Sequence, residues 1–275
     1  MTGTAPLVVP TEVAMIWVEG PDAATFLNGL LSHDVAALGV GGARPALLLN
    51  ERGHIRATVR VLRDADDAFT LLVAPERADE VVSTFARLHF TEDLDVLGPE
   101  VVAGVVTDGD VPEGADAMAP GDVPGTREVV GDAAVAALTA DVSDPGAARA
   151  ALEARRVAAA VPRVGVDTGE RTLVQEAGLQ DTHVSFSKGC YLGQETVSRA
   201  QHRGGVRRTL RVLRAGAPLA PGVTVTHGGA DVGVVTSAAT DADGTALALA
   251  MLRTSVPPGA AVDAGGVSAR VHDAR

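Results

Sequence analysis

The chain has 275 residues, of which 46% are hydrophobic and 21% charged, and its formal net charge is -12. A sequence of this length and composition buries a substantial core in one large or two modest domains, which excludes disorder throughout. The negative charge argues against non-specific binding to nucleic acid or anionic membranes, because such binding needs many basic side chains on phosphate groups.

The first twenty residues indicate a cytoplasmic protein. The segment MTGTAPLVVPTEVAMIWVEG has no basic stretch at its start, and Pro10 and Glu12 interrupt its apolar run. We therefore expect neither a signal peptide nor a membrane span. The single cysteine, Cys190, excludes an internal disulfide and an iron–sulfur cluster held by four cysteines of this chain.

The first hundred residues predict strands and helices in mixed order. Hydrophobic alternation favours a strand over residues 13–18, and Asp22 is typical of the N-cap of a helix whose apolar face includes Phe26 and Leu30. The segment ARPALLLN, a turn at residues 51–53 and the segment HIRATVRVLR follow in the order of a β-hairpin.

A further strand, FTLLVA, leads into a helix that starts at Pro75 and buries Val81 and Phe85. Residues 107–145 are rich in Gly, Pro, Ala and Asp, and we expect only a short strand near Val129 and a weak helix there. The elements mix without a regular βαβ order, which indicates an α+β fold with mixed or antiparallel sheets.

The last third of the chain changes character. A helix is predicted over residues 147–160, where Ala and Arg favour it and Pro162 ends it. After the basic stretch RAQHRGGVRRTLRVLR, short Val-rich and Thr-rich strands separated by Gly and Asp turns predict a small C-terminal β-barrel or sandwich. We place a domain boundary near Gly204 and Gly205, which predicts domains at residues 1–204 and 205–275.

The segment KGCYLGQE at residues 188–195 concentrates unusual residues. Lys188 is the only lysine of the chain, Cys190 the only cysteine and Tyr191 the only tyrosine, and Gly189 and Gly193 flank the thiol. Glycines allow positive φ and close approach of a ligand, and a neighbouring ammonium favours the thiolate form of a cysteine. The pattern predicts a poised thiol, and the alternative is an inert, buried cysteine that only packs.

The segment KGCYLGQETVSR closely resembles the signature of the folate-binding YgfZ family, which is related to the glycine-cleavage T-protein. VEGPDAATFLNGLLSHDV, LLLNERGHI, TLVQEAGLQD and VGVVTSAA resemble other parts of that family in the same order, and only residues 107–145 lack a clear counterpart. The resemblance implies a T-protein-like body followed by a small C-terminal β-barrel. It also implies tetrahydrofolate, or a one-carbon derivative of it, as the cofactor.

The resemblance also implies a pterin-binding carboxylate. T-proteins carry a glutamate in a segment like LRLEAG that binds the pterin ring, and Glu176 in LVQEAG matches it. A carboxylate accepts two parallel N–H bonds from the pterin edge, whereas a solvated or capping glutamate is the alternative. We take Cys190 and Lys188 as candidate catalytic residues. The candidate folate-binding residues are Glu176, Gln175, Tyr191, Gly193, Gln194 and Arg199.

One departure from T-proteins limits the resemblance. T-proteins follow their LN-x-x-G turn with an aspartate that acts in aminomethyl transfer, but here Arg56, Ala57 and Thr58 stand around that place. Full glycine-cleavage activity is therefore not expected. The KGC thiol motif is in turn not a feature of T-proteins.

Other patterns carry less weight. A dense basic stretch suits binding of the glutamate tail of folate, a phosphate or tRNA, and the alternative is an exposed strand face. Its residues are Arg199, His202, Arg203, Arg207, Arg208, Arg211 and Arg214. Aromatic residues are only 3% of the chain, which disfavours direct nucleic-acid binding. The histidines are scattered without ligand spacing, and we predict no metal site.

Three hypotheses follow for function. The first is a folate-binding accessory factor that, by resemblance, supports assembly or repair of iron–sulfur clusters in client enzymes, including those that modify tRNA, with client or carrier proteins as partners. The second is a folate-dependent one-carbon transferase that acts on an unidentified acceptor, with Cys190 as nucleophile or acceptor. The third is a scaffold that docks cluster-carrying proteins through the KGCYLGQE segment without catalysis.

Overall fold

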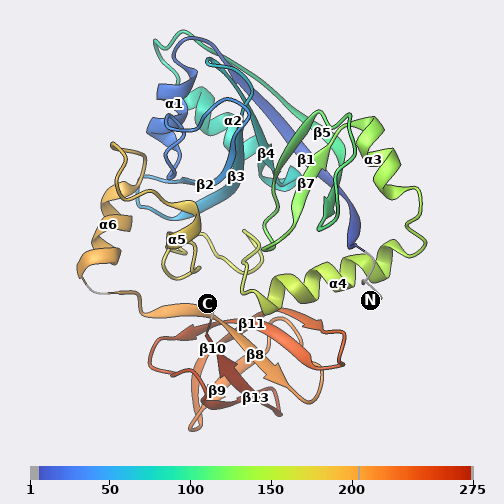
Figure 1. Cartoon of the computed structure of the whole chain (residues 1–275). Coiled ribbons are helices and arrows are strands. Elements are labelled where there is room, and N and C mark those ends of the chain that lie inside the picture. The colour runs from blue at the N-terminus through green and yellow to red at the C-terminus, as the bar shows by residue number, and fades with distance from the viewer. Residues whose placement is uncertain (1–5, 204, 274–275) are drawn as a thin grey trace. The chain divides into compact units, whose positions relative to one another are not determined.

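The computed structural model describes residues 6–203 and 205–273 and divides into two compact units (Figure 1). Unit 1 comprises Met1–Pro145 and Asp181–Gln194, and unit 2 comprises Gly146–Gln180 and Glu195–Arg275. The chain thus crosses between the units three times, whereas we predicted one boundary near Gly204. Gly204 and the first five residues of the chain lie outside the described residues. The division into residues 1–204 and 205–275 stays a prediction.

Unit 1 is built on a seven-stranded sheet in the order β2-β3-β4-β1-β5-β7-β6, in which every neighbouring pair is antiparallel. The strands are β1 (Val8–Glu19), β2 (Ala43–Leu49), β3 (Ile55–Arg63), β4 (Ala68–Val73), β5 (Asp95–Thr107), β6 (Ala117–Pro120) and β7 (Arg127–Val130). The predicted β-hairpin is β2 and β3, joined by the turn at residues 50–53. The sheet confirms the α+β prediction.

Two helices cover one face of this sheet. Helix α1 (Ala23–Leu30) and helix α2 (Pro75–Leu88) bury Phe26 and Phe85 against each other, with ring centroids 5.6 Å apart in an edge-to-face arrangement (Figure 1). Asp22 lies at the predicted N-cap of α1 but makes no side-chain cap. Its carboxylate accepts the N–H of Asp93 instead, because the chain after α2 passes beside it.

Residues 107–145 hold more structure than their composition suggests. The expected strand near Val129 is β7 and the expected helix is α3 (Asp132–Thr139), but β6 was not predicted. Strand β5 was also missed, because Gly98, Pro99 and Gly104 interrupt its pattern. Its pairing with β1 along almost the whole strand stabilises it despite these residues.

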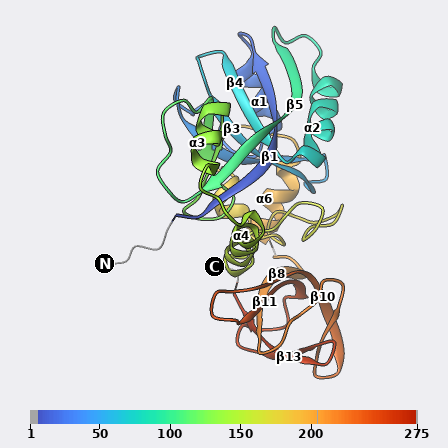
Figure 2. The ribbon, with the colours of Figure 1, turned by 90° about the vertical axis from the view of Figure 1, so that its right-hand side faces the viewer.

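Unit 2 contains the C-terminal barrel. Six strands close in the order β10-β11-β8-β13-β12-β9 (Figure 2). They are β8 (Arg208–Ala215), β9 (Thr224–His227), β10 (Ala230–Thr240), β11 (Ala246–Arg253), β12 (Ala261–Ala264) and β13 (Val267–His272). The barrel encloses an apolar core that includes Leu213, Val235 and Leu252. This confirms the predicted C-terminal barrel.

Helix α4 (Pro145–Ala158) packs on the outside of the barrel, where Val157 joins a cluster with Leu210 and Leu249. A buried polar network joins the helix to β10. Asp167, 2% exposed, accepts the Arg156 guanidinium at 2.7 Å and the Ser237 hydroxyl at 2.7 Å. These bonds satisfy both buried charges.

Candidate functional site

The KGCYLGQE segment runs between the short helix α5 (Gln180–His183) and helix α6 (Gln194–Arg203). Residues 188–191 have no regular secondary structure, and Cys190 is a free, exposed thiol. The loop that carries it, residues 185–193, is tied to unit 1 at its start, where the Ser185 N–H donates to the Ser32 carbonyl at 3.0 Å. We call these residues the thiol loop.

Lys188 fixes the thiol loop to the end of helix α1. Its Nζ donates to the carbonyl oxygens of Asn28 at 2.5 Å, Leu31 at 2.7 Å and His33 at 3.1 Å. The last carbonyls of a helix have no partner within it and carry the negative end of its dipole, so an ammonium there is stabilising. Partial burial lowers the pKa of Lys188 to about 8, and the charge of Asp34 opposes this shift.

Tyr191 holds the loop on the other side of the cysteine. Its ring is buried and lies below the Lys188 ammonium, with Nζ 5.0 Å from the ring centroid. The next residue, Leu192, donates its N–H to the Gly29 carbonyl at 3.0 Å. Burial raises the pKa of Tyr191 to about 12. Its hydroxyl is buried and has no hydrogen-bond partner among the described residues.

The two glycines of the thiol loop have different roles. Gly193 has φ +79°, and a Cβ there would lie 2.5 Å from the Asn50 carbonyl oxygen, in the turn between β2 and β3. Only glycine fits at this position. Gly189 has no atom within 4 Å of its would-be Cβ and no positive φ. The backbone of the thiol loop therefore lies close to another segment at Gly193, after Cys190, but not at Gly189, before it.

These contacts describe how Cys190 is presented. The residues on both sides of it are held against α1 and the β2–β3 turn, and the thiol itself faces solvent. All three hydrogens of the Lys188 ammonium have backbone carbonyl acceptors, which makes Lys188 a positioning residue for the loop. Direct action of Lys188 on the thiol stays a prediction.

Glu176 lies in unit 2 and is 7% exposed. Its Oε1 accepts the Arg208 Nε–H at 2.8 Å, and its Oε2 accepts a second Arg208 N–H at 3.3 Å. Oε2 also accepts the N–H of Leu173 at 3.0 Å. The carboxylate is thus held by a forked guanidinium and one backbone amide, which is the geometry that a planar ligand with two N–H donors requires.

Gln175 and Arg199 also lie in unit 2. The Gln175 amide donates to the Val197 carbonyl in α6 at 2.9 Å, and its Oε1 is buried without a partner among the described residues. Arg199 is exposed and pairs with Glu195 at 2.5 Å, one helical turn away. Gln194 begins α6 and donates its N–H to the Tyr191 carbonyl at 3.2 Å.

The structure therefore brings the predicted residues together in two groups. Lys188, Cys190, Tyr191, Gly193 and Gln194 belong to unit 1, and Gln175, Glu176 and Arg199 belong to unit 2.

Sequence reasoning missed two sets of partners. The carbonyls that bind Lys188 are backbone atoms, so no side-chain pattern marks them. Arg208 was noticed only as one of several arginines and not as the partner of Glu176.

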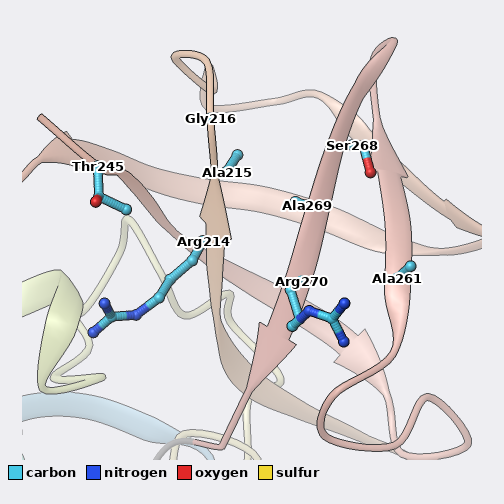
Figure 3. Close-up of a pocket in the computed structure, with 8 residues that line it drawn as sticks. All are labelled: Arg214, Ala215, Gly216, Thr245, Ala261, Ser268, Ala269 and Arg270. Atoms are coloured by element: carbon cyan, nitrogen blue, oxygen red, sulfur yellow. The ribbon is translucent and has the colours of Figure 1, made fainter.

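The basic stretch is largely neutralised by carboxylates. Arg208 pairs with Glu176, and Arg211 pairs with Asp273. Arg214 instead lines a shallow pocket of about 290 Å³ on the barrel, together with Arg270, which is its direct neighbour on β13 (Figure 3). Figure 3 shows the two guanidinium groups turned to opposite sides. No residue of the thiol loop lines this pocket, so it is not the candidate site.

Comparisons with known proteins show what the chain is similar to. The GCVT N-terminal domain family matches residues 9–103. The chain is 29% identical over 232 residues to the tRNA-modifying protein YgfZ of Edwardsiella ictaluri, covering 74% of this chain and 69% of that protein. It is 40% identical over 68 residues to the tRNA-modifying protein YgfZ of Yersinia enterocolitica, covering 24% of this chain and 21% of that protein.

A solved structure has the same fold. The glycine cleavage system aminomethyltransferase T from Bartonella henselae superposes with a TM-score of 0.81 at 20% sequence identity, covering 97% of this chain and 85% of that one. Among the described residues, no helix is long and apolar enough to cross a membrane. The chain is thus similar in sequence to proteins named YgfZ, and it shares the fold of the glycine-cleavage T-protein.

Proposed function

We propose that this chain is a cytoplasmic, folate-binding accessory protein that supports tetrahydrofolate-dependent assembly or repair of iron–sulfur clusters in client enzymes, including enzymes that modify tRNA. The observation that carries the proposal is the exposed Cys190 on a loop whose two sides are anchored by Lys188 and Gly193. A fixed, solvent-facing thiol is accessible to a partner protein, whereas a thiol that only packs is buried. Relatives that are called tRNA-modifying proteins support the choice of clients.

The residues present fit a reduced folate. The Glu176 carboxylate accepts two N–H donors in one plane, which suits the amino and ring N–H groups of a pterin. Gln175 Oε1, next to Glu176 in unit 2, is buried and lacks a partner within the described part of the chain, and a bound ligand would supply one. In this proposal Glu176 holds the pterin edge. Gln175, Tyr191, Gly193, Gln194 and Arg199 are the further candidate contacts.

The chemistry divides between the cofactor and the chain. A reduced folate, when bound, carries a one-carbon unit. Of the candidate catalytic residues, Cys190 offers a nucleophilic sulfur at the surface, and Lys188 holds the loop that presents it. Since the structure contains one cysteine, a cluster would be held by partner proteins and not by this chain alone.

The one-carbon transferase hypothesis has less support. Strand β3 carries Arg56, Ala57 and Thr58 around the place where T-proteins have an aspartate. Arg56 lies 3.6 Å from Glu80 in an ion pair, and none of these three residues offers the carboxylate that aminomethyl transfer uses. The scaffold hypothesis shares the exposed thiol loop with our proposal and differs from it only in lacking folate binding.

Calorimetric titration with tetrahydrofolate tests the folate part of the proposal. We expect binding to the wild-type chain and at least tenfold weaker binding to Glu176→Gln, because the amide has one acceptor atom and its nitrogen donates where the second N–H needs an acceptor. A suitable control is Glu195→Gln, which removes a carboxylate from an exposed pair. Absence of binding to the wild type would favour the scaffold hypothesis.

Complementation tests the thiol part. In cells that lack the native protein, we expect wild type to restore the activities of iron–sulfur enzymes and Cys190→Ser to fail. Ser187→Ala changes an exposed side chain of the same loop and is expected to restore them. Full restoration by Cys190→Ser would overturn a functional role for the thiol.

A further inference from the structure

Glu176 already binds a planar pair of N–H donors. Arg208 Nε lies 2.8 Å from Oε1, and a terminal nitrogen of the same guanidinium lies 3.3 Å from Oε2. A guanidinium and the 2-amino-4-oxo edge of a pterin share one pattern, in which two N–H groups project in parallel from an N–C–N unit. The two groups therefore compete for the same oxygen atoms.

Two backbone bonds hold Glu176 in addition to Arg208. The Leu173 N–H donates to Oε2 at 3.0 Å and fixes one carboxylate oxygen. The Leu210 N–H of strand β8 donates to the Glu176 backbone carbonyl at 2.8 Å. A carboxylate fixed in this way is preorganised for a second partner of the same shape.

Arg208 is able to leave its position at low cost. Its side chain is 45% exposed, whereas the Glu176 side chain is 10% exposed. A half-exposed guanidinium turns into solvent without becoming a buried, unpaired charge. Arg156 provides the contrast, because its side chain is 8% exposed and its partners lie in the interior of unit 2.

We propose that Arg208 occupies the pterin-binding carboxylate in the ligand-free protein and is displaced when folate binds. The contact makes Glu176 selective, since a ligand replaces Arg208 only if it also offers two parallel N–H donors. Without a ligand, Arg208 keeps the buried carboxylate satisfied. This inference rests on the proposed function, because it takes Glu176 as the pterin-binding residue.

Titration of a set of variants with 5-formyltetrahydrofolate tests the displacement. Arg208→Gln lacks the guanidinium that competes for Glu176. We expect it to bind folate about three- to tenfold more tightly than wild type, which corresponds to the free energy of a partly exposed ion pair. Arg208→Lys keeps the charge without the fork and should bind with intermediate affinity. Arg163→Gln is the matched control in the same unit, since the Arg163 side chain is 49% exposed, pairs with Glu153 and should leave folate affinity unchanged.

The double variant Glu176→Gln with Arg208→Gln separates the possible outcomes. If Arg208 acts by competing for Glu176, the double variant binds as weakly as Glu176→Gln alone. A 2-deamino folate analogue, which lacks one donor, should lose most of the gain in Arg208→Gln.

One result would contradict only the displacement of Arg208, and another would also contradict the pterin site. If Glu176→Gln weakens binding but Arg208→Gln leaves it unchanged or weakens it, displacement is wrong and the pterin site stands. If Glu176→Gln has the affinity of wild type, the pterin site itself is misplaced and the inference fails with it.

Discussion

The ammonium nitrogen of Lys188 lies 5.0 Å from the centroid of the Tyr191 ring and donates to carbonyls at the end of helix α1. The two residues stand on either side of Gly189 and Cys190 in the sequence. Their contact closes the base of a short loop and leaves the thiol at its exposed tip. The only lysine, the only cysteine and the only tyrosine of the chain therefore belong to one loop.

Replacing Lys188 with Met is expected to lower the free energy of unfolding of unit 1 by about 2–3 kcal/mol, because three carbonyls lose a charged donor. Trp17, the only tryptophan, lies in β1 of unit 1 and reports its unfolding in urea by fluorescence. Arg87→Gln removes an exposed pair with Glu51 and should change the value by under about 0.5 kcal/mol. Equal unfolding midpoints for Lys188→Met and wild type would contradict the capping role.

The glycines on either side of Cys190 are expected to respond differently to alanine. Gly193→Ala places a methyl group 2.5 Å from the Asn50 carbonyl at a positive φ, so the thiol loop must shift and unit 1 should lose at least about 2 kcal/mol. Gly189→Ala meets no atom within 4 Å and should be tolerated. The measurement is urea unfolding of both variants, together with the rate at which a thiol reagent modifies Cys190. Similar losses of stability in both variants would contradict the close contact of Gly193 with the Asn50 carbonyl.

His183 is expected to make unit 1 less stable in acid. Burial lowers its pKa from 6.5 to about 4, with the charges of His33 and Arg60 adding to the effect and Asp122 opposing it. Between these two pH values the unfolded chain binds the proton and the folded chain does not, so stability is complete above pH 6.5 and falls as the pH drops toward 4.

The expected size of this effect is about 2–3 kcal/mol between pH 7 and pH 4.5. It is measured as the difference in pH dependence between wild type and His183→Gln, since carboxylates and other histidines contribute equally to both. Parallel curves for the two proteins would show that the imidazole titrates alike in the folded and unfolded states.

Asp167→Ala is expected to destabilise unit 2 by about 2–4 kcal/mol, because the buried donors of Arg156 and Ser237 and the Thr236 hydroxyl lose a shared acceptor, while Glu153 still pairs with the guanidinium. Far-UV circular dichroism in urea follows the loss of the barrel. Arg199→Gln breaks an ion pair between side chains that are 66% and 85% exposed, and it should cost no more than about 0.5 kcal/mol. A loss for Asp167→Ala as small as that control would show that the network is not required.

Local patterns predicted much of the fold. The β2–β3 hairpin, the apolar faces of α1 and α2 and the short strands of the barrel follow from periodicity and turn residues that act over a few positions. Strand β5 was not predictable in this way, since Gly98 and Pro99 interrupt its pattern and only its register against β1 stabilises it as a strand.

By itself, the sequence determined that a lysine, a cysteine and a tyrosine stand within four positions, with glycines on both sides of the cysteine, and that a glutamate precedes them in a T-protein-like segment. Only the tertiary structure decided what these residues touch. Lys188 binds carbonyls 155–160 positions earlier in the chain, and Glu176 binds Arg208, 32 positions later. The physical reason is that charge and hydrogen-bond donors are properties of a residue, whereas their partners are fixed by the packing of distant segments.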